Sequence, residues 1–293
     1  MKKFQQVLTM ADPSETQTND WRLAMRDTDY SHPNHLLASL MAAGSEHLLG
    51  SLEMVSLKFG DVLYESESRI RYAYFPTTSI VSLVYMMEDG ATDEIAAVGN
   101  EGIIGVPLFM GSETTPSRAV VRCAGCAFRM KGSVLLEEFH GSTTVQQILL
   151  RYTQSLFAQI SQTAACNRHH SVHQQLCRWL LSSLDRLPSN ELKITHESIA
   201  GMLGVRRESV SKEAAELQAA GLIHNGRGRI TVLDRRRLET RACECYRGIK
   251  REFGRLLSPP AVAPSTFAVD GVAVPRHVPM PRTPQVPTWT ANA

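Results

Sequence analysis

The sequence predicts an α+β protein: an N-terminal antiparallel β-roll (double-stranded β-helix or jelly-roll-like), a long dimerisation helix and a C-terminal winged helix-turn-helix. Three observations predict this order. Short alternating segments fill the first half of the chain, a helical repeat begins near Ser142, and two short apolar stripes flank Gly204. With 293 residues, of which 43% are apolar and 20% charged, the chain is long enough for two globular domains with tails.

The two ends of the chain differ in composition from its middle. Residues 1–30 mix charged and amide side chains without the apolar stretch of a secretory signal, so we expect a flexible arm. Residues 258–293 hold eight of the fourteen prolines, which predicts a disordered tail. No apolar run reaches the roughly 20 residues that span a bilayer. Six cysteines are also too few for a dense disulfide framework. We therefore expect a reduced, cytoplasmic protein without a membrane partner.

Residues 31–140 are predicted to form the β-roll. Short segments that read as strands recur between turn residues, at 56–57, 62–64, 72–75, 80–87, 94–98, 119–122 and 126–130. Many short strands at near-regular spacing are typical of a small antiparallel barrel or roll. The interior of such a roll either encloses a small molecule or is filled by side chains alone.

Residues 141–166 are predicted to form one long helix. Apolar and small side chains recur there at steps of three and four: Val145, Leu149, Tyr152, Leu156, Ile160 and Thr163. This spacing is close to the 3.5-residue repeat of paired helices, so we expect a homodimer through this seam. The same spacing also fits a helix that packs against its own domain.

Residues 167–235 carry the pattern of a winged helix-turn-helix. A first helix is expected at about 169–187, ending before Pro188. Thr195 lies where a helix N-cap belongs, and Gly204 lies where a left-handed residue can end that helix. The apolar residues on both sides of Gly204 fall at helical spacing and can share one small core: Ile199, Leu203, Val210, Ala214 and Leu217.

Cations gather at the start of the second helix and on a predicted hairpin at 224–233, where Asn225-Gly226 supplies a turn signal. A recognition helix places the donors of its first turn against base edges in the major groove, so double-stranded DNA is the expected partner. Charge supports this: from Lys193 to Arg255 there are 14 basic against 8 acidic residues, a net charge of +6, whereas the remainder carries −4. The residues expected to contact DNA are Thr195, His196, Arg206, Arg207, Glu208, Ser209, Ser211, Lys212, Arg227 and Arg229.

Residues 236–257 are predicted to form an arginine-rich C-terminal helix. On such a helix Cys243 and Cys245, two positions apart, would face different directions and make no joint site. His169, His173 and Cys177 recur at steps of four, but capping, packing and polar contacts at the domain junction are the favoured interpretation. No metal site and no cofactor are expected.

The combination of roll, long helix and winged helix-turn-helix resembles the Crp/Fnr family of bacterial transcription regulators. The resemblance covers about residues 35–233 and is most specific in Ile194-Thr195-His196-Glu197-Ser198-Ile199-Ala200 and in Gly204-Val205-Arg206-Arg207-Glu208-Ser209-Val210-Ser211-Lys212. The segments Gly60-Asp61-Val62-Leu63-Tyr64-Glu65, Tyr74-Phe75-Pro76 and 99–105 are also similar to the family's roll. The resemblance implies a homodimer that binds palindromic promoter DNA, works with RNA polymerase and usually responds to an effector held in the roll.

The resemblance also implies roles for single residues on the second helix. The family's Arg-Glu-Ser/Thr opening of the recognition helix matches Arg207, Glu208 and Ser209. Arg207 would donate a forked pair to a guanine, and Glu208 would accept from a cytosine amino group. Lys212 stands where many members have arginine; because lysine lacks the planar fork, we expect it on a phosphate or a single acceptor.

The remaining polar residues are assigned to the DNA backbone. Arg206 is expected to face solvent or phosphate, and Arg227 and Arg229 of the hairpin to touch phosphates. Thr195 and His196 resemble the family's backbone contacts at the start of the first helix. Capping and solvent exposure are the equally weighted alternative for these two residues.

No effector can be assigned from the roll. Cyclic-nucleotide-binding members carry a glutamate after a glycine in a turn, and later an arginine followed by serine or threonine. Here Ile103 stands in place of the acid, and Ser117-Arg118 reverse the later order. Because alternate strand residues face opposite sides, we expect Arg118 to point away from the pocket, and cyclic AMP is not the expected ligand.

Two other functions stay open beside the DNA-binding regulator. Cys123 and Cys126 have a spacing that suits a thiol- or metal-responsive sensor, although no cysteine precedes Cys123, unlike the family's iron–sulphur members. The other possibility is an interaction protein whose helix-turn-helix no longer binds DNA. The sequence contains no phosphate-binding glycine loop, nucleophile elbow or credible triad, so an enzyme is not expected. Activation and repression are not distinguished.

Overall fold

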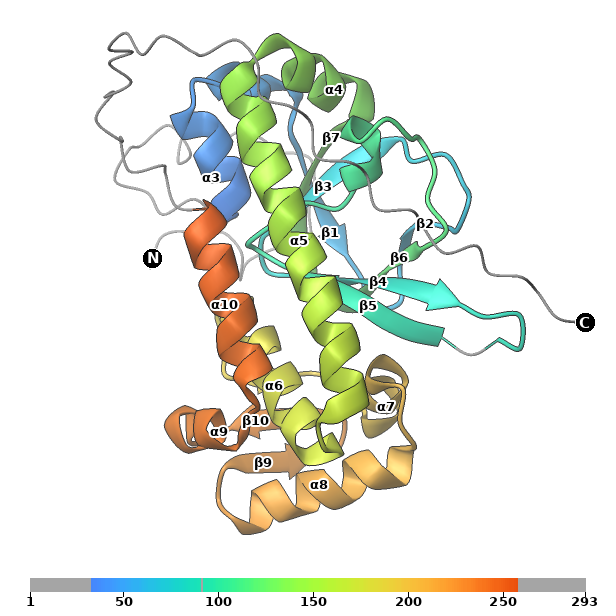
Figure 1. Ribbon diagram of the computed structural model, residues 1–293, viewed down its shortest axis with the longest axis vertical. Coiled ribbons are helices and arrows are strands. Elements are labelled where there is room, and N and C mark those ends of the chain that lie inside the picture. Colours follow the sequence, from blue (N-terminus) through green and yellow to red (C-terminus); the bar gives the residue numbers. More distant parts are fainter. Residues whose placement is uncertain (1–32, 91, 258–293) are drawn as a thin grey trace, which may run out of the picture. The chain divides into compact units, whose positions relative to one another are not determined.

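The computed structural model describes residues 33–90 and 92–257 (Figure 1). The predicted arm at 1–30 and tail at 258–293 lie outside these residues. The roll consists of two antiparallel sheets with strand orders β1-β7-β3 and β2-β6-β4-β5, which confirms the predicted fold class. Its strands are β1 (Glu53–Leu57), β2 (Val62–Tyr64), β3 (Tyr72–Pro76), β4 (Ile80–Met86), β5 (Thr92–Val98), β6 (Arg118–Cys123) and β7 (Gly125–Lys131).

Helical segments that the alternating pattern did not predict flank and interrupt the strands. They are α3 (His35–Ala42), η1 (Glu46–Ser51), η2 (Val106–Phe109) and α4 (Gly132–Gly141). Asn34 fixes α3 to the roll: its Oδ1 accepts from the backbone N–H of Leu37 at 2.9 Å, and its Nδ2 donates to the carbonyls of Pro76 and Gly102, each at 2.8 Å. One buried side chain therefore caps the helix and joins it to two loops of the roll.

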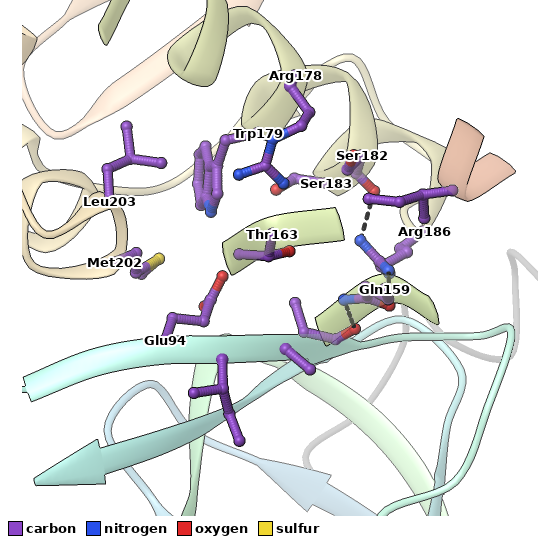
Figure 2. Close-up of a pocket in the computed structure, with 14 residues that line it drawn as sticks. Glu94, Gln159, Thr163, Arg178, Trp179, Ser182, Ser183, Arg186, Met202 and Leu203 are labelled. Carbon is purple, nitrogen blue, oxygen red and sulfur yellow. Dashed lines mark hydrogen bonds between the residues drawn. The ribbon is translucent and has the colours of Figure 1, made fainter. Parts of the chain in front are cut away.

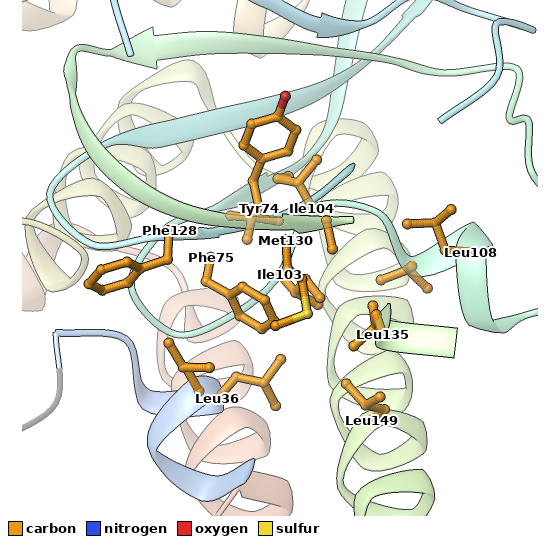
Figure 3. Packing of buried hydrophobic residues seen from close by; sticks show 14 of the residues in the cluster. Leu36, Tyr74, Phe75, Ile103, Ile104, Leu108, Phe128, Met130, Leu135 and Leu149 are labelled. Atoms are coloured by element: carbon orange, nitrogen blue, oxygen red, sulfur yellow. The ribbon is translucent and has the colours of Figure 1, made fainter. Parts of the chain in front are cut away.

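Side chains from the strands and from the surrounding helices fill the interior of the roll (Figure 3). Phe75 and Phe128, paired across β3 and β7, are fully buried. Leu36 of α3 and Leu149 of α5 (Thr143–His169) close the cluster from the helical side (Figure 3). Burying side chains of this size stabilises the fold by about 1.5–3 kcal/mol each, before conformational entropy is counted.

The long helix α5 packs its predicted seam against its own roll. Val145, Leu149 and Tyr152 are fully buried, and Leu156 is only 6% exposed. The prediction that this seam forms the dimer interface was therefore wrong, and packing on its own domain, the alternative, is what the structure has. Periodicity could not distinguish a dimer interface from packing against the same domain, because both require one apolar stripe on the helix.

The next helix, α6 (Val172–Asp185), is shorter than the predicted 169–187. Ser171 is the N-cap residue of α6 and forms a capping box: its side chain accepts from the backbone of Gln174, whose side chain in turn accepts from the backbone of Ser171. α7 (His196–Leu203), α8 (Arg207–Ala219) and the three-stranded sheet β8-β10-β9 complete the domain, with β8 at Glu191–Leu192, β9 at Ile223–Gly226 and β10 at Arg229–Val232.

The expected single helix at 236–257 is two helices, α9 (Arg235–Arg241) and α10 (Glu244–Leu257). The chain turns at Ala242, which is extended with a ψ of 152°, and α10 then runs alongside α5 (Figure 1). None of the helices within 33–257 is both long and apolar enough to cross a membrane.

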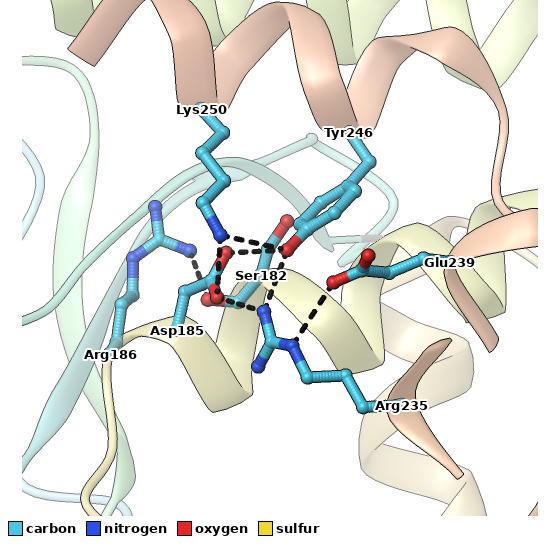
Figure 4. Close-up of polar contacts among 7 residues, drawn as sticks. All are labelled: Ser182, Asp185, Arg186, Arg235, Glu239, Tyr246 and Lys250. Atoms are coloured by element: carbon cyan, nitrogen blue, oxygen red, sulfur yellow. Dashed lines mark hydrogen bonds and ion pairs between the residues drawn. The ribbon is translucent and has the colours of Figure 1, made fainter. Parts of the chain in front are cut away.

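A polar cluster joins α6, α9 and α10 (Figure 4). The Tyr246 hydroxyl donates to Asp185 at 2.9 Å and accepts from Arg235 at 2.8 Å. Arg235 also pairs with Asp185, and Lys250 lies 3.4 Å from the same carboxylate. These contacts hold the last two helices against the core of the domain.

Candidate DNA interface

The helix pair α7–α8 has the caps that the sequence predicts. The Thr195 hydroxyl accepts from the backbone N–H of Ser198 at 3.1 Å, and Gly204 ends α7 in the left-handed region with a φ of 63°. The five predicted core residues are all buried: Ile199, Leu203, Val210, Ala214 and Leu217. A tight turn on a shared apolar core therefore fixes the angle between the two helices.

The first turn of α8 is open to solvent. Its N-cap residue, Arg206, makes no side-chain capping hydrogen bond, so backbone N–H groups at the helix start stay available. Arg206, Arg207 and Glu208 are exposed, and Lys212 follows one turn later with 71% of its side chain accessible. Arg207 lies 4.0 Å from Glu197 of α7, a loose surface contact between side chains that are 65% and 77% exposed. A positive helix end with free donors suits a polyanion.

Two residues that the sequence assigned to DNA are engaged with each other. His196 lies half-buried, with Nδ1 2.9 Å from the Ser211 hydroxyl and Nε2 3.0 Å from Oδ1 of Asn225. The first contact joins α7 to α8, and the second joins α7 to the hairpin. His196 therefore positions the recognition helix and the hairpin relative to each other. Sequence spacing could not show this, because the three residues come from separate elements.

The hairpin β9–β10 places further cations beside α8. Arg227 and Arg229 are exposed, and Arg229 lies 3.6 Å from Glu191 of the neighbouring strand β8. A cleft of about 460 Å³ opens between the start of α7, the start of α8 and the hairpin. Its lining includes Thr195, Arg207 and the backbone of Gly228. The backbone of the hairpin and the N-terminal ends of α7 and α8 thus border one groove that is open to solvent.

The roll touches this domain directly through β5 and α6. Figure 2 shows Arg178 and Trp179 of α6 across a small cavity from Glu94 of β5, with Arg186, the C-cap residue of α6, beside Gln159. Arg186 bridges the two parts: its Nε donates to Glu101 at 2.7 Å and its Nη2 to Gln159 of α5 at 3.3 Å. The Arg186 and Glu101 side chains are only 9% and 14% exposed, so the ion pair is largely desolvated.

The region where cyclic-nucleotide-binding members carry an acid is packed against α5. Ile103 is buried, and its carbonyl accepts from the Tyr152 hydroxyl at 3.2 Å. A Cβ at Gly102 would lie 2.2 Å from that hydroxyl, so only glycine fits there. Arg118 pairs with Glu65 at 3.2 Å. Tyr152 therefore occupies the space beside the turn.

Cys123 ends β6 and is buried, and Cys126 follows in β7 and is half-buried; both are free thiols. Burial and the nearby Glu94 raise the pKa of the Cys123 thiol to about 12, and burial also raises the pKa of Cys126. A raised pKa disfavours the thiolate, which is the form that reacts or binds metal. Neither residue belongs to a candidate ligand group among the described residues. The alternative of a sensor built on these two cysteines loses its support.

Three other cysteines lie close to one another in the structure. Cys166, Cys243 and Cys245 lie together with His170 at the junction of α5, α9 and α10. Sequence reasoning excluded a joint site for Cys243 and Cys245 because it treated 236–257 as one helix. Cys243 instead lies in the turn between two helices, so the rule that residues two apart on a helix diverge does not apply to it.

Comparisons with known proteins agree with this architecture. Residues 174–241 match the family model of the Crp-like helix-turn-helix domain. No curated protein sequence matches the chain. FixK2 from Bradyrhizobium japonicum has a TM-score of 0.58 at 17% identity, covering 66% of this chain and 98% of its own. A putative regulator of the Crp/Fnr family from Eubacterium rectale has 0.56 at 20%, covering 72% and 98%.

A third solved structure, TTHB099 from Thermus thermophilus, is described as a transcriptional regulator of the CRP family. It has a TM-score of 0.53 at 22% identity and covers 64% of this chain and 96% of its own. At these identities the solved structures establish the fold, and the domain match establishes the kind of DNA-binding unit. Residues 174–241 therefore form a Crp-like helix-turn-helix domain, and the chain as a whole has the fold of these solved structures, with an antiparallel β-roll before that domain.

Proposed function

We propose that this protein binds a palindromic DNA site as a homodimer and inserts α8 of each copy into the major groove. The observation that carries the proposal is the open start of α8, where uncapped backbone donors and exposed Arg206 and Arg207 project from a rigid helix pair. An N-terminal helix turn with these donors matches the way helix-turn-helix proteins read base edges.

Within this interface the residues divide into three groups: those that contact bases, those that contact phosphates and those that position the elements. Arg207 pairs with a guanine and Glu208 with a cytosine amino group, each good pair giving about 1–3 kcal/mol of discrimination. Ser209 lies on the same helical turn and adds a third polar side chain to these base contacts. Phosphate contacts come from five exposed residues, of which Thr195 borders the groove: Thr195, Arg206, Lys212, Arg227 and Arg229. His196 and Ser211 act by holding α7, α8 and the hairpin in register.

The dimer forms through the face of α5 that its own roll leaves uncovered. Leu150 and Phe157 are 48% and 65% exposed, which is unusual for large apolar side chains. With Gln154, Ser161 and Ala164, also exposed, they recur at steps of four and three along the helix. This is the heptad spacing of a two-stranded coiled coil, and it lies on a different face from the predicted seam.

The roll controls the domain by biasing its orientation. Support comes from the desolvated Arg186–Glu101 pair and from the contact of α7 with β5, both of which link the two parts directly. An effector acts only if it binds one orientation more tightly than the other. As a promoter-bound protein it works in the cytoplasm and beside RNA polymerase.

Selection of random duplex DNA by the purified protein, followed by footprinting, tests the proposal. The expected result is a palindrome whose half-sites lie about 10 base pairs apart, one helical turn. The Arg207→Ala variant should relax the sequence at one base pair per half-site. Arg236→Ala, an exposed arginine on α9 away from α8, is the matched control and should select the wild-type site. Recovery of no sequence by wild-type protein would refute DNA recognition.

A further inference from the structure

Three cysteines and one histidine gather where α5, α9 and α10 meet. Cys166 lies near the end of α5, His170 is its C-cap residue, Cys243 lies between α9 and α10, and Cys245 is in the first turn of α10. The three thiols are 0%, 3% and 1% exposed, and they form a cluster apart from the two apolar cores. They come from chain segments more than seventy positions apart, so only the fold brings them together.

The separations among the four side chains suit a metal ion. The Cys166 and Cys243 sulphurs are 3.6 Å apart, and the Cys245 sulphur is 3.5 Å from Nδ1 of His170. All four ligand atoms lie within 4.8 Å of one another. In a zinc tetrahedron with Zn–S near 2.3 Å and Zn–N near 2.05 Å, the S–S edges are about 3.8 Å and the S–N edges about 3.6 Å. Two edges therefore already have nearly these lengths, and the others need at most about 1.2 Å of contraction.

We propose that Cys166, His170, Cys243 and Cys245 bind a zinc ion. Three cysteines and a histidine are a ligand set of structural zinc sites, which are closed by four protein ligands and leave no position for substrate. On binding, the three thiol protons pass to solvent and the three thiolates and neutral imidazole take their place around Zn²⁺.

The groups around the four ligands are arranged as in metal sites. Nε2 of His170 faces a carboxylate oxygen of Glu244 at 3.3 Å, which favours the proton on Nε2 and leaves Nδ1 for the metal. The Gln162 side chain donates to the Cys245 sulphur at 3.0 Å, a contact that stabilises a thiolate. The backbone N–H of His170 donates to the Cys166 carbonyl at 3.0 Å and fixes the C-x-x-x-H pair at the helix end.

A disulfide is the competing use of these cysteines. The Cys166 and Cys243 sulphurs are at contact distance, well beyond the roughly 2.05 Å of a covalent bond. A disulfide between them would use two of the four groups and leave unexplained why His170, with its carboxylate partner, faces the third thiol. Zinc uses all four.

The test is metal uptake by the full-length, reduced protein. We expect protein purified without chelator to contain one zinc per chain by elemental analysis. After removal of the metal, Co²⁺ should bind at the same ratio and give the visible absorption of a tetrahedral thiolate complex, which Zn²⁺ then abolishes. Cys243→Ser and His170→Gln should each bind zinc at least about tenfold more weakly.

Two matched variants locate the site. His169→Gln changes the exposed neighbour of His170, and Cys126→Ser changes a half-buried thiol of the roll; both should keep one zinc per chain. Circular dichroism checks that every variant is folded, and the Co²⁺ spectrum of the unmodified protein needs no variant at all. A reduced protein that takes up neither ion overturns the proposal. So does equal zinc affinity in Cys243→Ser, or loss of two thiols as a Cys166–Cys243 disulfide without metal.

Discussion

Arg207 and Lys212 are both exposed cations on α8, yet their side-chain chemistry separates their expected effects. Arg207→Ala should cost about 1–3 kcal/mol at one base pair per half-site, because the planar fork pairs with two acceptors of a guanine. Lys212→Ala should weaken binding to all sequences alike and lower the slope of log affinity against log salt by about one per site. Affinities for matched and mismatched duplexes at several salt concentrations measure both. Equal loss on every duplex for Arg207→Ala would assign it to phosphate.

Glu94 is a carboxyl group buried between the roll and the DNA-binding domain (Figure 2). Burial raises its pKa, and its hydrogen bond with Ser82 only partly offsets that effect. A raised carboxyl pKa means that the folded state holds the proton more tightly. Its stabilising contribution is thus complete below the unfolded pKa and is lost as the pH rises through the folded pKa.

Glu94→Gln should therefore gain stability relative to the wild type as the pH rises, because glutamine never carries the buried charge. Urea unfolding of both proteins between about pH 5 and pH 8 measures the difference in free energy of unfolding. Glu53→Gln, which removes an exposed carboxylate on β1 that pairs with Arg129, is the control for the loss of a carboxyl group outside this contact. A difference that stays constant with pH would contradict the assignment.

For single residues, the sequence predicts roles that depend on neighbouring positions, but it does not predict contacts between residues of separate elements. Thr195 and Gly204 could be assigned as caps because capping depends on a few neighbouring residues. The contacts of His196 with Ser211 and Asn225 could not, since they join three elements. The cluster of Cys166, His170, Cys243 and Cys245 was missed for the same reason.

Among the elements, α5 shows what periodicity can establish. A repeat of apolar residues predicts that a helix has a covered side, and Val145, Leu149 and Tyr152 are indeed covered. It does not say whether the cover comes from the same chain or from a second copy. Periodicity does not reveal the exposed stripe with Leu150 and Phe157, because polar residues interrupt it.

Phe157→Glu should separate the dimer. A charge placed at a 65% exposed position of the proposed interface would have to be desolvated without a partner when two copies meet. Sedimentation velocity at micromolar concentration should show a monomer, with a loss of affinity for the palindromic site. Met110→Glu, a 60% exposed apolar residue of the roll, is the control and should remain dimeric. A dimeric Phe157→Glu protein would move the interface elsewhere.

At the scale of the molecule, the sequence predicted the order of the parts: roll, long helix and winged helix-turn-helix. It could not predict how the roll packs on the DNA-binding domain, because that contact depends on residues such as Glu101 and Arg186, which are 85 positions apart. Gly99 illustrates the point: a Cβ there would lie 2.6 Å from the Arg186 side chain, yet in sequence it is a plain turn residue.

Arg186→Ala should lower the free energy of unfolding by about 3 kcal/mol, because it leaves the carboxylate of Glu101 buried without its cation. The double variant Arg186→Met with Glu101→Gln should recover a large part of that loss, since it removes both charges. Urea unfolding curves of Arg186→Met, Glu101→Gln and the double variant give the coupling free energy. Additive effects would show that the pair does not link the two parts energetically.

The long helix α5 meets the roll with one side and offers Leu150 and Phe157 on another. Successive residues on a helix are about 100° apart around its axis, so Leu149 is buried against the roll whereas Leu150 is exposed. If two copies join along the exposed stripe, turning the helix to accommodate a change inside one roll also changes how the copies cross. The rotation of α5 that changes the packing inside each roll would then also change the distance between the two α8 helices of the dimer.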